Sequence, residues 1–273
     1  MIRARKRFGQ HFLEPVWVDK VIKAIAPQAD QDFIEIGPGP GALTRPLAQR
    51  AKSVTAFEID RDLASALEAE AIPNLTVVQG DFLEVADPAS PQAPAPSPSR
   101  VAGNLPYNVA SAIMFKLVEL HAAGVPLVDA TLMLQREVAD RLVAAPGSKE
   151  YGVLSILIQH RADVETVLRL PAGAFRPPPK VLSSLVRLRF REPQPTVRDE
   201  AVFARVVQAV FTRRRKTMAN ALLALEGSSL SARRPADTLV AADLDGTRRP
   251  ETLSIAEFAR LADVYSEGPS AVL

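Results

Sequence analysis

Four residues near the middle of the chain, Asn104-Leu105-Pro106-Tyr107, combine an amide, a rigid turn and an aromatic ring. Pro106 cannot continue the apolar run before it as a strand, because proline has no N–H to donate. An exocyclic amine of a nucleobase is a poor nucleophile, since its lone pair is delocalised into the ring. The Asn104 side chain and the carbonyl of Leu105 or Pro106 could accept its two N–H bonds, while Tyr107 stacks on the base. The tetrapeptide therefore predicts group transfer to a base amine, driven by orientation and proximity, and the alternative is an ordinary strand-to-helix turn.

A glycine-rich turn follows an apolar segment earlier in the chain. Gly37, Gly39 and Gly41 can adopt positive φ and let a ligand approach the backbone closely. With Ala42 the spacing matches a dinucleotide fingerprint, and with the preceding acid Glu35 it matches binders of S-adenosylmethionine. The turn alone also fits a tight strand-to-helix connection that binds nothing.

Two further acidic residues end the next two predicted strands. Glu58 lies about 20 residues after the glycine turn, where a carboxylate can accept hydrogen bonds from both hydroxyls of a ribose. The alternative role, a charge at the start of the next helix, suits Asp60 better as its N-cap. Asp81 is placed to accept from an adenine amino group, with Phe82 packed on the ring. Together these strand ends predict a nucleoside pocket at the carboxyl edge of a sheet.

The hydrophobic pattern predicts a Rossmann-like α/β domain with a mainly parallel sheet over residues 1–192, because strands alternate with helices. A proline-, alanine- and serine-rich stretch at 87–99 is expected to be a surface insertion within it. Residues 193–273 read as a small all-helical domain. The expected strands are 32–36, 53–58, 74–79, a run just before Asn104, 129–135, 164–170 and 181–190. The expected helices are 15–26, 42–51, 61–71, 109–120, 136–144, 152–162, 200–211, 214–225, 230–239 and 255–264.

The composition excludes several classes of site. The 273 residues include no cysteine, which rules out disulfides, thiolate metal sites and a cysteine nucleophile. The three histidines lie far apart in sequence, so we expect no metal site. No apolar run approaches the roughly 20 residues that span a bilayer, so we expect a soluble, cytoplasmic protein with no membrane partner. We also expect a monomer.

The basic residues are clustered, although the formal net charge is only +2. One block near the start contains Arg5, Lys6 and Arg7, and a second block consists of Arg213, Arg214, Arg215 and Lys216. Either block alone also fits a solvated surface. Two blocks flanking a predicted nucleotide site favour a polyanionic partner such as RNA.

These residues together resemble the ribosomal RNA adenine N6,N6-dimethyltransferase family, in particular its bacterial small-subunit (16S) branch. The resemblance runs nearly end to end through RFGQHFL, EIGPGPGALT, FEID, GDF, GNLPYNVAS, FRPPPKVLSSLVRL and FTRRRKTMANAL. It implies transfer of four methyl groups from S-adenosylmethionine to two adjacent adenosines near the 3′ end of 16S rRNA, late in assembly of the small subunit. It also implies that the helical C-terminal domain helps to engage the RNA.

Family roles carry over to matching positions of this chain. The cofactor contacts implied by the resemblance are His11, Leu13, Gly37, Glu58, Asp81 and Asn104. Phe175 corresponds to an aromatic residue that sandwiches the target base against Tyr107. The chain departs from the family at His11, where the family often has asparagine, and in its longer insertion at 87–99.

Three other functions fit part of the pattern. An enzyme of the antibiotic-resistance type that methylates 23S rRNA shares the glycine turn and a similar tetrapeptide. A DNA adenine methyltransferase would more typically carry an acid in place of Asn104 and needs a duplex-recognition domain. A non-catalytic assembly factor could use the same scaffold, but the intact tetrapeptide and both acids, Glu58 and Asp81, argue against a degenerate site.

Overall fold

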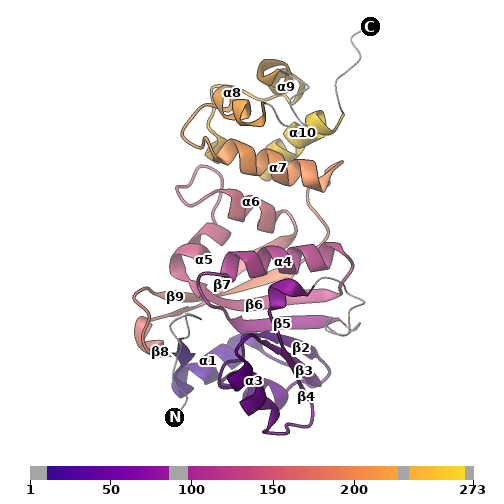
Figure 1. Ribbon diagram of the computed structural model, residues 1–273. Helices are drawn as coiled ribbons and strands as arrows, with labels where there is room; N and C mark the ends of the chain where they lie inside the picture. The colour runs from indigo at the N-terminus through magenta and orange to yellow at the C-terminus, as the bar shows by residue number, and fades with distance from the viewer. Residues whose placement is uncertain (1–10, 86–97, 227–233, 268–273) are drawn as a thin grey trace. The chain divides into compact units, whose positions relative to one another are not determined.

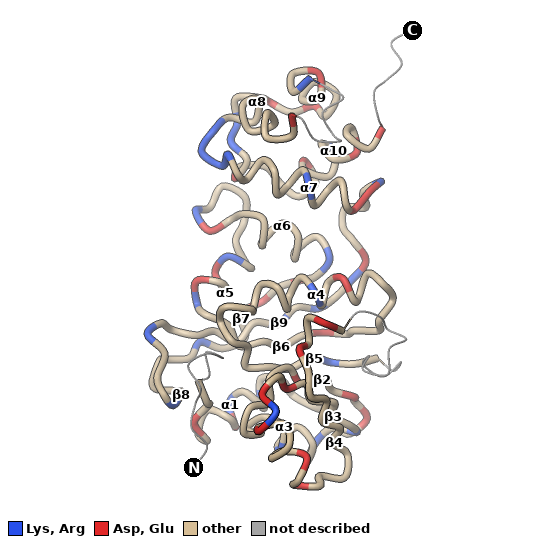
Figure 2. Tube along the Cα trace, viewed as in Figure 1, with Lys and Arg blue, Asp and Glu red and all other residues tan. Residues whose placement is uncertain are grey.

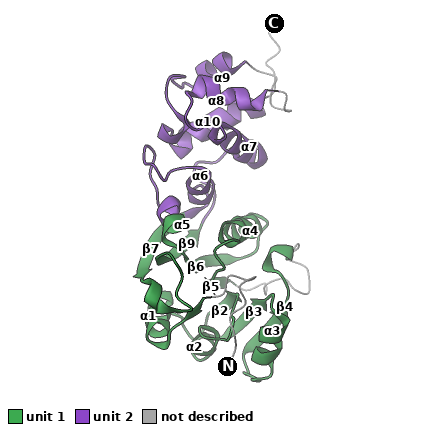
Figure 3. Cartoon of the chain, turned by 60° about the vertical axis from the view of Figure 1, so that its left-hand side comes forward, with its two compact units in different colours: residues 1–139, 163–190 green, residues 140–162, 191–273 purple. Residues whose placement is uncertain are grey.

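The computed structural model describes residues 11–85, 98–226 and 234–267. The chain forms two compact units, one of residues 1–139 and 163–190 and the other of residues 140–162 and 191–273 (Figure 3). The sequence placed the boundary at 192/193 and assigned 140–162 to the first domain. That segment clusters with the second unit because Tyr151 and Ile156 are buried in the second unit's hydrophobic core.

The first unit is built on a seven-stranded sheet of order β4-β3-β2-β5-β6-β9-β7 (Figure 1). Neighbouring strands from β4 to β6 pair in parallel, and β9 pairs antiparallel with β6. This confirms the predicted Rossmann-like α/β fold with a mainly parallel sheet. The strands are β2 (Asp32–Ile36), β3 (Ser53–Glu58), β4 (Leu75–Gln79), β5 (Ser99–Asn104), β6 (Leu127–Gln135), β7 (Ala162–Leu170) and β9 (Ser183–Phe190).

Helices connect and cover these strands. Their bounds are α1 (Pro15–Ile25), α2 (Thr44–Ala48), α3 (Arg61–Glu68), α4 (Ala110–Ala122) and α5 (Arg136–Leu142), with short 3-10 turns η2 (Phe82–Glu84) and η3 (Ala172–Ala174). All five residues of β2 are buried, as expected of a central parallel strand. Val21 and Ile25 of α1 share a core cluster with Phe33 of this strand. The Asp60 side chain accepts from the N–H of Asp62 at 3.1 Å, which confirms its role as the N-cap of α3.

A two-stranded ribbon completes the first unit. β1 (Phe12–Leu13) pairs antiparallel with β8 (Phe175–Arg176), and the N–H of Glu14 donates to the carbonyl of Ala174 at 2.8 Å. Neither short strand is apparent from hydrophobic periodicity. The ribbon fixes the described start of the chain to a segment about 160 positions away.

The second unit is helical. Its elements are α6 (Val153–Gln159), α7 (Glu200–Phe211), α8 (Met218–Ala221), the 3-10 turn η4 (Leu222–Leu225), α9 (Pro235–Ala241), the 3-10 turn η5 (Pro250–Thr252) and α10 (Ile255–Ser266). Phe203 and Val207 of α7 share the core with Phe258 and Leu261 of α10. A capping box starts α10, in which Ser254 and Glu257 satisfy each other's backbone N–H groups.

The structure corrects three predicted helices. Residues 212–216 form a turn rather than the start of a helix at 214. The N–H groups of Met218 and Ala219 donate to the carbonyls of Arg248 and Gly246, so distant backbone fixes where α8 begins. The helix expected at 230–239 is instead α9, which begins at Pro235. The helix expected at 152–162 ends at Gln159, and β7 begins at Ala162.

The insertion predicted at 87–99 lies outside the described residues except for its last two positions, and Ser99 already belongs to β5. In the described ranges, no helix has the length and apolar character needed to cross a membrane.

Candidate active site

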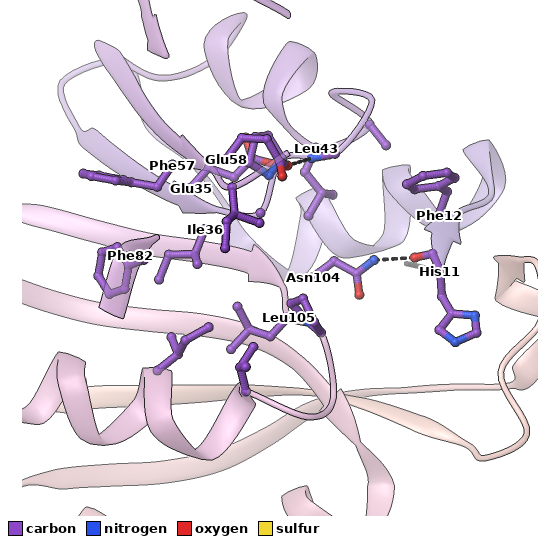
Figure 4. Close-up of a pocket in the computed structure, with 18 of the residues that line it drawn as sticks. His11, Phe12, Glu35, Ile36, Leu43, Phe57, Glu58, Phe82, Asn104 and Leu105 are labelled. Atoms are coloured by element: carbon purple, nitrogen blue, oxygen red, sulfur yellow. Dashed lines mark hydrogen bonds between the residues drawn. The ribbon is translucent and has the colours of Figure 1, made fainter. Parts of the chain in front are cut away.

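A pocket lies at the carboxyl ends of β2, β3, β4 and β5 (Figure 4). The strand order reverses between β2 and β5, and ligands of open α/β sheets bind at such a switch point. The pocket brings together most of the predicted site. Its lining includes His11, Leu13, Gly37, Gly39, Glu58, Asp81, Phe82, Asn104, Leu105, Pro106 and Tyr107.

The glycine turn after β2 has the backbone that only glycine adopts readily. The φ angles of Gly37, Gly39 and Gly41 are 69°, 58° and 82°. A Cβ atom at Gly39 would lie 3.4 Å from the ring of Phe12. Gly41 does not line the pocket, and a Cβ there would meet Arg45 at 3.0 Å. Gly41 is therefore a packing position, while the first two glycines border the cavity.

Glu58 joins the end of β3 to the glycine turn. Its Oε2 accepts from the N–H of Gly39 and its Oε1 from the N–H of Asp60, both at 2.9 Å. Burial raises the pKa of Glu58, and these two backbone hydrogen bonds act in the opposite direction. Each carboxylate oxygen can accept a second hydrogen bond, so both can still receive ligand hydroxyls.

Glu35 is the most perturbed acid of the pocket. Its side chain is only 1% exposed, and Oε2 has no hydrogen-bond partner among the described residues. Burial, with a further contribution from the charge of Glu58, raises the pKa of Glu35 to about 7, although Thr44 and Arg45 oppose the change. A buried carboxyl with one unpaired oxygen fits a cationic ligand group, such as the ammonium of an amino acid. The acid therefore suits the methionine part of S-adenosylmethionine.

Asp81 and Phe82 follow β4. Oδ1 of Asp81 accepts from the N–H of Leu83 at 2.9 Å and caps η2. The Phe82 ring is buried edge-on against Phe57, with a centroid separation of 5.3 Å and an interplanar angle of 81°. Both residues line the pocket. Hydrogen bonding of Asp81 to an adenine amino group remains a prediction.

Asn104 is oriented by the residue that directly precedes β1. Its Nδ2 donates to the main-chain carbonyl of His11 at 2.7 Å, as the dashed line in Figure 4 marks. The side-chain oxygen is therefore the atom left to accept from a substrate. The carbonyl of Pro106 accepts from the N–H of Val109 at 3.2 Å, which favours the Leu105 carbonyl as the second acceptor.

Tyr107 is held at both its hydroxyl and its ring. The hydroxyl bonds to Oγ of Ser183 at 2.7 Å, and burial raises the pKa of the phenol, so Tyr107 is neutral. The imidazole of His11 is stacked on the ring with a centroid separation of 5.8 Å and an interplanar angle of 25°. Nδ1 of His11 donates to the carbonyl of Pro177 at 2.7 Å. His11 therefore has two contacts in the site: its imidazole packs on the Tyr107 ring, and its main-chain carbonyl accepts from Asn104.

Phe175 does not occupy the expected position. Its side chain is 1% exposed, belongs to the core cluster with Leu13 and Leu170, and does not line this pocket. In β8 the side chains alternate, so Phe175 points inward and Arg176 outward. The sandwich of a base between Phe175 and Tyr107 is thus not preformed.

The predicted RNA-contacting residues separate into two groups. Arg5, Lys6 and Arg7 lie outside the described residues. The second block forms the turn after α7, which Figure 2 shows as a blue segment. Arg214 donates to the carbonyl of Lys149 at 2.6 Å, and Arg213 donates to the carbonyl of Asn220 at 3.2 Å. Arg215 and Lys216 are exposed and suit phosphate contacts best.

Several lining residues were not identified from the sequence. Phe12, Leu43, Phe57 and Ile113 supply apolar walls. Phe12, Leu43 and Phe57 lie inside the motifs RFGQHFL, EIGPGPGALT and FEID, whereas Ile113 lies outside the motifs quoted above. The described residues contain no group of three or more histidine or acidic side chains that could hold a metal ion.

Comparison with known proteins shows which family the chain matches. The sequence profile described as "Ribosomal RNA adenine dimethylase" matches residues 1–264. The chain belongs to this family. Among similar proteins, one named ribosomal RNA small subunit methyltransferase A from Leptothrix cholodnii is 43% identical, covering 97% of this chain and 93% of its own. A protein of the same name from Xanthomonas euvesicatoria is also 43% identical, covering 96% of both chains.

Two solved methyltransferase structures are similar to this chain. A dimethyladenosine transferase from Plasmodium falciparum has a TM-score of 0.76 and 26% identity, covering 92% of this chain and 96% of its own. The 23S rRNA methyltransferase ErmE has a TM-score of 0.64 and 28% identity, covering 93% and 99%. The chain is thus an S-adenosylmethionine-dependent ribosomal RNA adenine dimethyltransferase, and the pocket at the switch point is its candidate active site.

Proposed function

We propose that this dimethyltransferase modifies two adjacent adenosines near the 3′ end of 16S rRNA in the immature small ribosomal subunit. The observation that carries the chemistry is the fixed amide of Asn104, whose nitrogen is held by His11 so that its oxygen is left for the substrate. The small-subunit target is supported by the names of the relatives. These relatives are more than 40% identical to this protein over nearly its whole length.

The residues of the pocket divide into cofactor and substrate contacts. Glu58 would accept from ribose hydroxyls, Asp81 from the adenine amino group, and Glu35 would face the ammonium. When bound, S-adenosylmethionine supplies an electrophilic methyl group. The Asn104 oxygen and the Leu105 carbonyl accept the two N–H bonds of the target amine, which turns its lone pair out of conjugation.

Tyr107 then presents a flat, neutral ring against the target base. No strong general base is needed, because the methylated nitrogen is acidic enough to release its proton to water. Rate enhancement comes from positioning, which is effective when the reacting atoms are held at near-contact distance. The target base has to be unstacked before it can enter the pocket.

A labelled-methyl assay tests the proposed substrate. Immature small subunits lacking the modification, naked 16S RNA and large subunits would each receive labelled S-adenosylmethionine and the enzyme. Dimethyladenosine in small subunits alone is the expected result. Incorporation into 23S RNA would instead support the antibiotic-resistance type, and cofactor binding without any transfer would support a non-catalytic assembly factor.

The proposed substrate is assembled in the bacterial cytoplasm, so we expect the enzyme to act there. We also expect it to act as a monomer, a prediction that light scattering of the purified protein checks.

A further inference from the structure

A second, more open groove lies beside the active-site pocket on the first unit. Its lining consists of Glu14, Val16, Trp17, Gly173, Phe175, Arg176, Pro177 and Pro178. The groove and the pocket share the β1–β8 ribbon, because Phe12 and Leu13 of β1 line the pocket while both residues of β8 line the groove. Figure 1 shows β8 beside α1, the helix that carries Trp17.

A short chain of contacts links the two sites. The ring of Tyr107, in the pocket, is stacked on the imidazole of His11 at 5.8 Å. That imidazole donates to the carbonyl of Pro177, in the groove, at 2.7 Å. The side chains of Tyr107 and His11 therefore separate the position proposed for the target base from the groove.

The chemistry of the lining matches single-stranded nucleic acid. Trp17 and the two prolines offer apolar surfaces to a base, and Val16 is 70% exposed beside them. Nζ of Lys20 lies 4.1 Å from the centroid of the Trp17 ring. Such combinations of aromatic surface and cation are typical of sites for unpaired nucleotides.

Arg176 is the cation best placed to contact a phosphate. Its Nε pairs with the carboxylate of Glu14, yet its side chain remains 85% exposed. Glu14 would repel a phosphate if it were unpaired. Because the Glu14 carboxylate pairs with Nε of Arg176, it orients the guanidinium and leaves the two terminal nitrogens available to a phosphate.

We propose that this groove binds the nucleotide adjacent to the target adenosine, with its base against Trp17 and Pro177 and its phosphate on Arg176. The inference rests on the proposed function, since it needs a substrate in which the target is part of an unpaired strand. It gives Phe175 a role as the apolar floor of this groove instead of a partner of Tyr107 in stacking.

Trp17 is the only tryptophan of the chain, so its fluorescence reports on this groove directly. Titration of the full-length enzyme with a short unstructured oligoadenylate should change the emission saturably. Arg176→Ala should weaken this binding about five- to tenfold, which is the effect expected of one exposed charge-assisted contact. Arg176→Lys should restore part of it, and Lys23→Ala, an exposed cation on the same helix, should have no effect.

Kinetics on small subunits separate binding from chemistry. Arg176→Ala should raise KM for the subunit and leave kcat unchanged. The proposal is overturned if saturating oligoadenylate leaves Trp17 emission unchanged, or if Arg176→Ala binds it as tightly as the native protein. In either case continued methyl transfer to small subunits would show that the proposed function still stands. Loss of all transfer with intact Trp17 quenching would instead overturn the proposed function.

Discussion

The buried carboxyl of Glu35 should make the stability of the protein depend on pH between about 4.5 and 7. Its pKa is about 7 in the native protein against an ordinary 4.5, because the carboxyl is buried. The native state therefore binds this proton more tightly than the unfolded state between pH 4.5 and 7. The contribution of Glu35 to stability therefore falls as the pH rises through that window and is level above it. A pKa difference of about 2.5 corresponds to about 3 kcal/mol at 1.36 kcal/mol per pH unit.

Glu35→Gln removes this titration while keeping the shape of the side chain. We expect urea unfolding at pH 5, 6, 7 and 8 to show a native protein that loses about 2–3 kcal/mol relative to the variant as the pH rises. Because the other groups titrate in both proteins, the difference between their free energies of unfolding isolates the effect of Glu35. Glu68→Gln, an exposed acid on α3, is the matched control and should follow the native curve. Parallel curves for native protein and Glu35→Gln would refute the argument.

Further substitutions test the other parts of the site. Tyr107→Ala should reduce turnover at least 100-fold and leave cofactor affinity nearly unchanged, whereas Tyr107→Phe should keep most turnover; equal losses in both variants would contradict stacking. Glu58→Gln should weaken S-adenosylmethionine binding about tenfold by calorimetry. Burial lowers the pKa of His160, so the contribution of His160 to stability should fall as the pH drops below about 6.5, and urea unfolding of His160→Gln at pH 5–7 should lack that loss relative to the native protein. Neutralising Arg215 and Lys216 together should reduce the salt slope of RNA binding by about 2; an unchanged slope would exclude phosphate contacts.

The pocket residues that could be predicted from the sequence are those at or just after the end of a strand. Gly37, Glu58, Asp81 and Asn104 all lie at the carboxyl edge of one parallel sheet, and any chain with that strand order brings them together. A strand of two residues has no periodic pattern that shows which side chain faces inward, so the position of Phe175 in β8 does not follow from the sequence.

Long-range backbone contacts explain the remaining differences. The turn containing the second basic block looks helical in sequence, since arginine and lysine favour helices. Its end is set by hydrogen bonds from Met218 and Ala219 to carbonyls of a segment almost 30 residues further on. Likewise, the pairing of β1 with β8 leaves no periodic signal in either segment.

The β1–β8 ribbon also constrains when the enzyme becomes competent during synthesis. His11 and Pro177 are 166 positions apart, yet their hydrogen bond lies at the wall of the catalytic pocket. Translation proceeds at about 5–20 residues per second, so the β1 segment leaves the ribosome many seconds before its partner strand exists. A nascent chain that already contains Asn104 and the whole glycine turn still lacks β8, the partner of the strand that begins directly after His11. The β1–β8 ribbon beside the catalytic pocket therefore forms only after most of the chain has been translated.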